Sequence, residues 1–170
     1  MPATRNAAVG SIATLVPSPI GDILLTSDGD ALTGLYMSPH SGLPEIDVEP
    51  GNGDAFFDDV TAQLSAYFTG DLRSFDVAVR PTGTAFQLRV WSELTKIPYG
   101  ETISYADLAH RVGSPKGFRA VGQANGRNPV SVIVPCHRVI GADGSLTGFG
   151  GGSERKRFLL DLESPARQLI

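Results

Sequence analysis

"SYADLAHRVGSPKGFRAVGQANG", residues 104–126, contains two short helical patterns joined by a turn. Ser104 and Asp107 have the spacing of a capping box, so a first helix is expected to begin there and to end at Gly113. The pair Ser114-Pro115 fits the N-cap and first-turn preferences of a second helix, which continues to the end of the stretch. Two short helices with a tight, glycine-containing turn predict a helix-turn-helix, a motif that many DNA-binding proteins share.

The segment after this motif, "NPVSVIVPCHRVIGADG" at residues 128–144, carries the only cysteine of the chain. Its apolar run Val130–Val134 predicts a buried strand. Pro135 fixes its own backbone angle and therefore sits where a turn would begin, directly before Cys136. The cysteine thus lies at the end of a buried segment and next to His137.

Two interpretations of this cysteine remain open from the residues alone. A thiol attacks as the thiolate, and an unperturbed cysteine has a pKa of about 8.5, so fast chemistry needs a neighbour that lowers this pKa. His137, Arg138 and a carboxylate brought close by folding are the candidates. Because adjacent side chains of an extended segment point to opposite faces, a contact between Cys136 and His137 requires a turn or a bridging water. An inert buried cysteine fits equally well.

The rest of the C-terminal half is predicted to be mostly helical. Residues 84–97, "TAFQLRVWSELTKI", are amphipathic, and Trp91 is expected in the core. After a glycine-rich loop, Ser153 is expected to cap a last helix, which ends before Pro165.

The N-terminal half is predicted to consist of strands and turns followed by a helix. Residues 20–37 hold two apolar runs on either side of Asp28-Gly29, which indicates a hairpin. Residues 54–70 have helical spacing of apolar side chains, with Asp54 as the N-cap and Gly70 as the end. Phe75–Val79 predicts a short strand, and Pro81–Gly83 predicts a domain boundary.

Composition is typical of a soluble globular protein. The chain has 170 residues, of which 41% are hydrophobic and 19% are charged. It shows no apolar stretch of membrane-spanning length and no pattern of a signal peptide at its start. With a single cysteine, a reduced cytoplasmic protein is expected.

The charge is divided unevenly along the chain. Residues 1–80 carry 3 basic and 11 acidic side chains, whereas residues 81–170 carry 11 basic and 7 acidic ones, within a total of −4. The positive C-terminal half is suited to a polyanion, and the overall acidity argues against tight binding at high salt.

Two quoted stretches, "IPYGETISYADLA" at 97–109 and "RAVGQANGRNPVSVIVPCHRVIGADGSLTGFGGG" at 119–152, resemble the O6-alkylguanine-DNA alkyltransferases. The resemblance extends over about residues 84–163. It implies an α+β fold, in which residues 1–80 form a small ribonuclease H-like α/β domain. Residues 81–170 would form a mostly helical domain with a winged-helix-like helix-turn-helix and the active-site cysteine.

The resemblance implies direct reversal of DNA damage. After base flipping, the alkyl group of O6-alkylguanine in duplex DNA, above all methyl, would move irreversibly to Cys136, so each molecule acts once. Activity on O4-methylthymine stays open. No cofactor and no metal are expected. The implied partner is double-stranded alkylated DNA, bound through its minor groove with little sequence preference. The protein is expected to be a monomer, with cooperative binding left open.

The resemblance also assigns catalytic roles by position. Cys136 would be the acceptor, and His137 would act on it through a water while Glu163 orients the imidazole. Asn128 would be a hinge between the helix-turn-helix and the cysteine segment. Tyr105 would lie by the phosphate of the flipped nucleotide and offer its hydroxyl to the departing guanine.

Further residues would bind the DNA and the flipped base. Arg119 would enter the duplex and fill the space of the extruded nucleotide. Small residues would let the second helix approach DNA, and two cations would meet phosphates: Ala120, Gly122, Ala124 and Gly126, with Lys116 and Arg127. The base pocket would comprise Val139, Thr147, Phe149, Gly150 and Gly151. The family has a tyrosine where this chain has Phe149, so a phenol donor is missing and backbone N–H groups such as that of Gly150 would replace it.

Other classes of protein explain fewer of these features. An alkyltransferase-like protein binds alkylated DNA without the acceptor cysteine, which is present here. A helix-turn-helix transcription factor leaves Cys136 and His137 without a role. A cysteine hydrolase needs a separate histidine after the thiol. A metal site is disfavoured because His40, His110 and His137 lie far apart and only one cysteine is available.

Overall fold

The computed structural model describes residues 12–37 and 55–164. The chain divides into two compact units, Met1–Pro81 and Thr82–Ile170. The division falls at the proline-containing stretch 81–83. The predicted cap Asp54, the terminal Pro165 and His40 lie outside the described residues.

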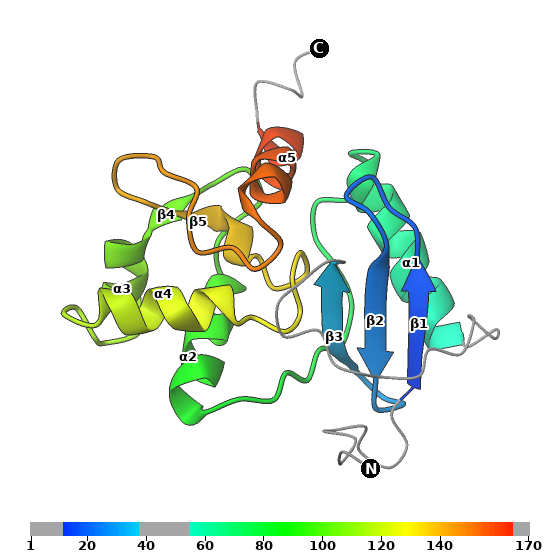
Figure 1. The fold of residues 1–170 in the computed structure, drawn as a ribbon. Coiled ribbons are helices and arrows are strands. Elements are labelled where there is room, and N and C mark those ends of the chain that lie inside the picture. The colour runs from blue at the N-terminus through cyan, green and yellow to red at the C-terminus, as the bar shows by residue number, and fades with distance from the viewer. Residues whose placement is uncertain (1–11, 38–54, 165–170) are drawn as a thin grey trace, which may run out of the picture. The chain divides into compact units, whose positions relative to one another are not determined.

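The first unit contains an antiparallel sheet of three strands in the order β1-β2-β3, followed by one helix (Figure 1). These elements are β1 (Ile12–Val16), β2 (Ile23–Ser27), β3 (Leu32–Met37) and α1 (Ala55–Phe68). The predicted hairpin is confirmed, because β2 and β3 pair across a turn in which Asp28 Oδ1 accepts hydrogen bonds from the amides of Asp30 and Ala31. The predicted helix is confirmed as well. It ends before Gly70, which has the left-handed φ of +84° that glycine tolerates.

The predicted strand at Phe75–Val79 is wrong. Only a single bridge forms there, between Leu32 and Val79. The backbone of Asp76 forms hydrogen bonds with a side chain instead. Gln63 on α1 donates to the carbonyl oxygen of Asp76 and accepts from its amide. Hydrogen bonds from a side chain of α1 thus replace the ladder that a strand would need.

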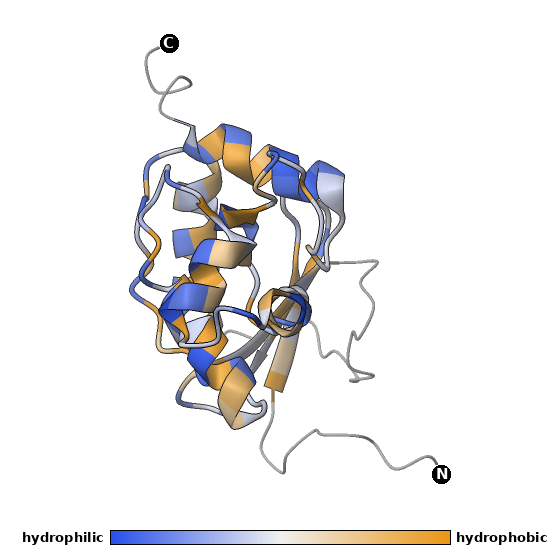
Figure 2. Cartoon of the chain, turned by 90° about the vertical axis from the view of Figure 1, so that its left-hand side faces the viewer, coloured by the Kyte–Doolittle hydropathy of each residue, from blue (hydrophilic) through white to orange (hydrophobic). Residues whose placement is uncertain are grey.

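The second unit is mostly helical. It comprises α2 (Ala85–Leu94), β4 (Ile103–Ser104), α3 (Tyr105–Arg111), α4 (Phe118–Gly126), the 3₁₀ turn η1 (Cys136–Arg138), β5 (Val139–Ile140) and α5 (Ser153–Glu163). Its helices carry both hydrophobic and hydrophilic residues (Figure 2). The buried Trp91 on α2 donates its indole N–H to the carbonyl oxygen of Ala124, 2.8 Å away, and so joins α2 to α4. The short strands β4 and β5 pair in parallel.

The helix-turn-helix consists of α3 and α4. The capping box at Ser104 and Asp107 is confirmed, with hydrogen bonds in both directions. The predicted start of the second helix at Ser114 is wrong. The amide of Gly117 donates to the carbonyl oxygen of Ser114, which closes a separate turn, and α4 begins only at Phe118.

Two further predictions need correction. Val130–Val134 forms a turn rather than a strand, because the amide of Val134 bonds back to the carbonyl oxygen of Val130 and Val132 has a φ of +72°. A positive φ is costly for a β-branched residue, so this turn must be held by its surroundings. Ser153 is the first residue of α5 rather than its cap. The cap position belongs to Gly152, whose φ is +93°.

The predicted α+β class is confirmed by this arrangement of a small sheet unit and a mostly helical unit. No helix within residues 12–37 and 55–164 has the length and apolar character that crossing a membrane requires.

Candidate active site

The thiol and the imidazole share one tight turn. Cys136, His137 and Arg138 form η1, with Pro135 at its N-cap position, so the turn expected from the sequence is present. Cys136 is only 2% exposed, and burial raises the pKa of its thiol. At rest the sulfur is therefore protonated, and it needs a base before it can attack.

Asparagine side chains hold this turn in place. Asn128 Nδ2 donates to the carbonyl oxygen of Val134 at 2.7 Å, and Asn128 Oδ1 accepts from the amide of Val130 at 3.0 Å. Asn125 Nδ2 donates to the carbonyl oxygen of Cys136 at 3.2 Å. These buried bonds tie the end of α4 to the segment that carries the thiol, which supports a positioning role for Asn128.

The imidazole of His137 is oriented by Glu163 on α5. His137 Nε2 lies 2.8 Å from Glu163 Oε2, and both side chains are buried. A carboxylate can only accept, so the hydrogen sits on Nε2 and the lone pair sits on Nδ1. Burial lowers the pKa of His137, which keeps the ring neutral. Nδ1 is buried and has no hydrogen-bond partner among the described residues. This combination is that of a general base that awaits a proton.

Arg138 stabilises the same carboxylate and does not serve as the activator of the thiol. Its Nε lies 2.7 Å from Glu163 Oε1, one terminal nitrogen lies 3.0 Å from Oε2, and the other donates to the carbonyl oxygen of Ile97. Burial raises the pKa of Glu163, but hydrogen bonds from His137 and Arg138 outweigh that effect and lower the pKa to about 2. Glu163 is thus a permanent anion behind the histidine.

Lys156 on α5 is a site residue that the sequence reasoning missed. It is fully buried, and its ammonium donates to the carbonyl oxygens of Val139 and Thr147 at 2.5 and 2.9 Å. Burial lowers the pKa of Lys156 to about 8, although the nearby Cys136 thiolate raises it. A positive charge so close to the sulfur favours the thiolate.

A periodicity argument could have found this lysine. Lys156, Leu159 and Glu163 are spaced three and four apart, which puts them on one face of α5. All three are buried. Arg138 and Asn125 left no comparable signal, because their partners come from distant parts of the chain.

Tyr105 links the helix-turn-helix to the glycine-rich loop. Its hydroxyl donates to the carbonyl oxygen of Thr147 at 2.5 Å. A Cβ on Gly148, whose φ is +75°, would collide with this hydroxyl. The loop therefore passes close to Tyr105 only because residue 148 is a glycine.

The predicted base-pocket residues differ in exposure. Val139 is buried and its carbonyl oxygen is held by Lys156, while Thr147 is exposed. Phe149 is buried, and Gly150 and Gly151 are half-buried in the loop.

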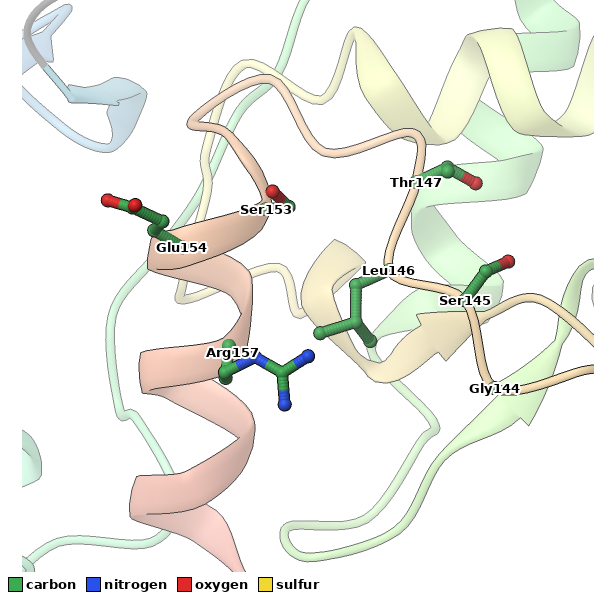
Figure 3. A pocket seen from close by; sticks show the side chains of 7 residues that line it. All are labelled: Gly144, Ser145, Leu146, Thr147, Ser153, Glu154 and Arg157. Carbon is green, nitrogen blue, oxygen red and sulfur yellow. The ribbon is translucent and has the colours of Figure 1, made fainter.

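A cavity of about 470 Å³ lies elsewhere on the loop (Figure 3). It is lined by residues 144–147 with Ser153, Glu154 and Arg157 of α5, so it shares only Thr147 with the predicted base pocket. Cys136 and His137 do not line it.

The predicted DNA-binding residues have different exposures. Arg119, Ala120, Lys116 and Arg127 are exposed, and Gly122 and Gly126 are half-buried. The prediction that Ala124 lies on the DNA-binding surface is wrong. Ala124 is only 3% exposed, and its carbonyl oxygen accepts a hydrogen bond from Trp91. It therefore belongs to the contact between α4 and α2.

No metal centre accompanies these side chains in the part of the chain that the structure describes. Within residues 12–37 and 55–164, no group of three or more His, Cys, Asp or Glu side chains is close enough to hold an ion. The site is thus made of a thiol, a neutral imidazole, a buried carboxylate and two buried cations.

A thiol with its own buried base, beside a helix-turn-helix, defines a cysteine-dependent class of protein with a nucleic-acid-binding motif. Two family models match the chain: "6-O-methylguanine DNA methyltransferase, ribonuclease-like domain" at residues 12–81 and "6-O-methylguanine DNA methyltransferase, DNA binding domain" at residues 85–165. A methylated-DNA–protein-cysteine methyltransferase of Methanosarcina acetivorans is 51% identical over 148 residues, which cover 86% of this chain and 94% of the relative. One from Mycobacterium tuberculosis is 51% identical and covers 87% and 89%.

Solved structures agree with these matches. The crystal structure of Mycobacterium tuberculosis OGT in complex with DNA superposes with a TM-score of 0.82 at 48% identity, over 92% of this chain and 96% of that one. A structure of the O6-methylguanine methyltransferase from the same organism gives a TM-score of 0.80 at 47% identity, over 90% and 92%. The chain belongs to the 6-O-methylguanine DNA methyltransferase family.

Proposed function

We propose that this protein repairs alkylated DNA by transferring the alkyl group of O6-alkylguanine in duplex DNA to Cys136. The observation that carries the proposal is the pairing of a buried thiol with a neutral histidine whose Nε2 hydrogen is committed to Glu163. The relatives named methylated-DNA–protein-cysteine methyltransferases, at 51% identity, support the same reaction.

The transfer begins with a proton. The Sγ–H proton moves through a water to Nδ1 of His137, and Glu163 stabilises the imidazolium that results. Cys136 and His137 are consecutive residues of η1, and Nδ1 of His137 has no hydrogen-bond partner among the described residues. A water is therefore needed to carry the proton from the thiol to the imidazole. Lys156 stabilises the thiolate by its charge.

The thiolate then attacks the alkyl carbon in line with the bond to O6. The S–C bond forms as the C–O bond breaks, and the electron pair of the broken bond passes to the purine, which takes up a proton. Backbone N–H groups of the loop around Gly150 stabilise this negative charge, and the Tyr105 hydroxyl does so once it turns from the carbonyl oxygen of Thr147 to the base. The thioether left on Cys136 has no leaving group to expel, so one molecule repairs one lesion.

DNA is bound through α4 in this proposal. Arg119 occupies the space of the extruded nucleotide, while Lys116 and Arg127 meet phosphates. Ala120, Gly122 and Gly126 let the backbone of α4 enter the minor groove. The exposure of Arg119, Lys116 and Arg127, and the net charge of +4 on residues 81–170, support this surface.

The roles of the two domains follow from the two residue ranges that the family models match. We assign residues 1–80 to the ribonuclease H-like domain and residues 81–170 to DNA binding and catalysis. The protein acts as a cytoplasmic monomer without a cofactor. Cooperative binding along DNA would appear as a Hill coefficient above one in a titration with long duplexes.

A mass measurement tests the reaction. The protein is mixed with duplex DNA containing O6-methylguanine under reducing conditions, and the intact chain is weighed. A gain of one methyl group that is absent in Cys136→Ala supports the transfer. Tight binding of the duplex by the wild-type protein without any gain in mass would favour the alternative, a non-catalytic alkylated-DNA-binding protein.

A further inference from the structure

Phe118 is an aromatic side chain without cover. It is the first residue of α4 and is 54% exposed, more than any other large hydrophobic side chain among the described residues. A ring that is more than half exposed adds little stability to the fold by burial. Its exposed face is available to a partner outside the chain.

The ring stands at the start of a row that leads to the active site. Phe118, Gly122 and Gly126 are spaced four apart, so they lie on one side of α4. A Cβ on Gly122 would lie 3.7 Å from Cδ1 of Tyr105, and one on Gly126 would lie 3.3 Å from the carbonyl oxygen of Gly148. This side of the helix thus faces the edge formed by Tyr105 and the glycine-rich loop. In this row only Phe118 has a large side chain, because the other two residues are glycines.

The charges around the ring identify the chemistry of its partner. Arg119 follows it directly, and Lys116 precedes it by two residues; both are exposed. The described residues give neither cation a carboxylate partner within ion-pair distance. A nucleic acid fits both features, because its phosphates carry negative charge and its bases present flat apolar faces.

We propose that Phe118 is a wedge that packs against the base step beside the extruded nucleotide. The inference rests on the proposed function, because it presumes that a nucleotide is flipped next to α4. Arg119 fills the vacated space with a charged, hydrogen-bonding group, and Phe118 covers the apolar face of the neighbouring base, which loses its stacking partner. Apolar side chains inserted at a base step from the minor groove unstack it and hold the duplex bent.

The first test compares two substrates. Phe118→Ala is expected to lower the rate of Cys136 alkylation on a methylated duplex by about tenfold, since an aromatic–base stack is lost. Its rate with free O6-benzylguanine should equal that of the wild type, because the free base needs no wedge. Phe118→Trp should retain the duplex rate. Leu88→Ala, at an exposed leucine of α2 that is 40% exposed, is the matched control and should leave both rates unchanged.

The second test observes the base step itself. Cys136→Ala protein is bound to a duplex with 2-aminopurine beside the O6-methylguanine, and the fluorescence rise upon unstacking is recorded. The double variant Cys136→Ala, Phe118→Ala should give a smaller rise at saturating protein.

The outcomes separate the two proposals. If Phe118→Ala matches the wild type on the duplex and gives the same fluorescence, the wedge is wrong and the repair function stands. If the wild-type protein alkylates Cys136 with neither substrate, the proposed function fails. The fluorescence comparison still decides in that case whether Phe118 reaches the DNA.

Discussion

Glu163 is the residue on which the electrostatics of the site depend. It accepts from His137 and from two nitrogens of Arg138, and it is only 1% exposed. Removing its charge leaves a buried guanidinium without a counterion, which typically costs about 3–5 kcal/mol. The carboxylate is therefore a structural requirement before it is a catalytic one.

Glu163→Gln should lower the free energy of unfolding at pH 7 by about 3 kcal/mol or more. The pKa of Glu163 is about 2 in the folded protein, below its ordinary value of 4.5. Its contribution is thus complete above pH 4.5 and is lost as the pH falls toward 2. Urea denaturation at pH 7 and pH 3 should show the gap between wild type and variant shrinking at pH 3. An equal gap at both values would contradict this linkage.

Lys156→Met tests the buried cation. At pH 7 the ammonium is charged, and its loss should slow alkylation of Cys136 by free O6-benzylguanine about tenfold, which is 1.4 kcal/mol. The pKa of Lys156 is about 8, so the wild type loses the same charge as the pH rises past that value. The difference between the two rates should therefore shrink by pH 9. A ratio that stays constant from pH 7 to 9 would assign Lys156 a purely structural role.

Phe149→Tyr tests the loss of the phenol. Phe149 is buried in the loop, and a change of its side chain removes none of the backbone N–H groups of that loop. The rate of transfer from a methylated duplex should change less than tenfold, or about 1.4 kcal/mol. A larger gain would mean that a donor is missing from the pocket of this protein.

At the scale of elements, the loop and α4 depend on glycines in different ways. Gly148→Ala places a Cβ against the Tyr105 hydroxyl at a positive φ, so it should destabilise the fold by about 1–3 kcal/mol and slow both substrates. Gly122→Ala meets only ordinary contacts and should stabilise α4 slightly. It should nevertheless slow transfer from duplex DNA, and spare free O6-benzylguanine, if that face enters a groove. Equal rates of both variants on both substrates would refute the distinction.

Sequence patterns predicted the elements with local signals. The capping box at Ser104, the hairpin at Asp28 and the amphipathic α1 and α2 were all readable, because each depends on residues a few positions apart. The turn at Val130–Val134 was not, since its apolar composition fits a strand, whereas the Asn128 side chain bonds the backbone of Val130 and Val134 and so favours a turn.

The same limit applies to the site. Cys136 and His137 were identified because they are adjacent in a specific motif, whereas Arg138 was only one of three candidates for lowering the pKa of the thiol. Its actual partner, Glu163, lies 25 residues away and reaches it only through the packing of α5. Ala124 was misplaced on the DNA side because the small size of a residue does not say whether it lies on the face of α4 that the core covers.

At the scale of the whole molecule, charge and chemistry are concentrated in one unit. The residues of the proposed reaction all lie after Pro81, where the net charge is +4, while residues 1–80 carry −8. A protein that is acidic overall can still attract DNA to one surface, because exposed cations act within about a Debye length, roughly 8 Å at physiological salt.

The burial of Cys136 also determines the fate of the protein after repair. Its site is closed, with 2% exposure and a turn clamped by two asparagines. A methyl group added to the sulfur must displace packed neighbours, and such overpacking typically costs about 1–3 kcal/mol. The spent protein should therefore melt several degrees below the fresh one, and a benzylated protein lower still, in a thermal scan. Equal melting temperatures would mean that the site yields without strain. Loss of stability would give the cell a physical mark by which used molecules differ from unused ones.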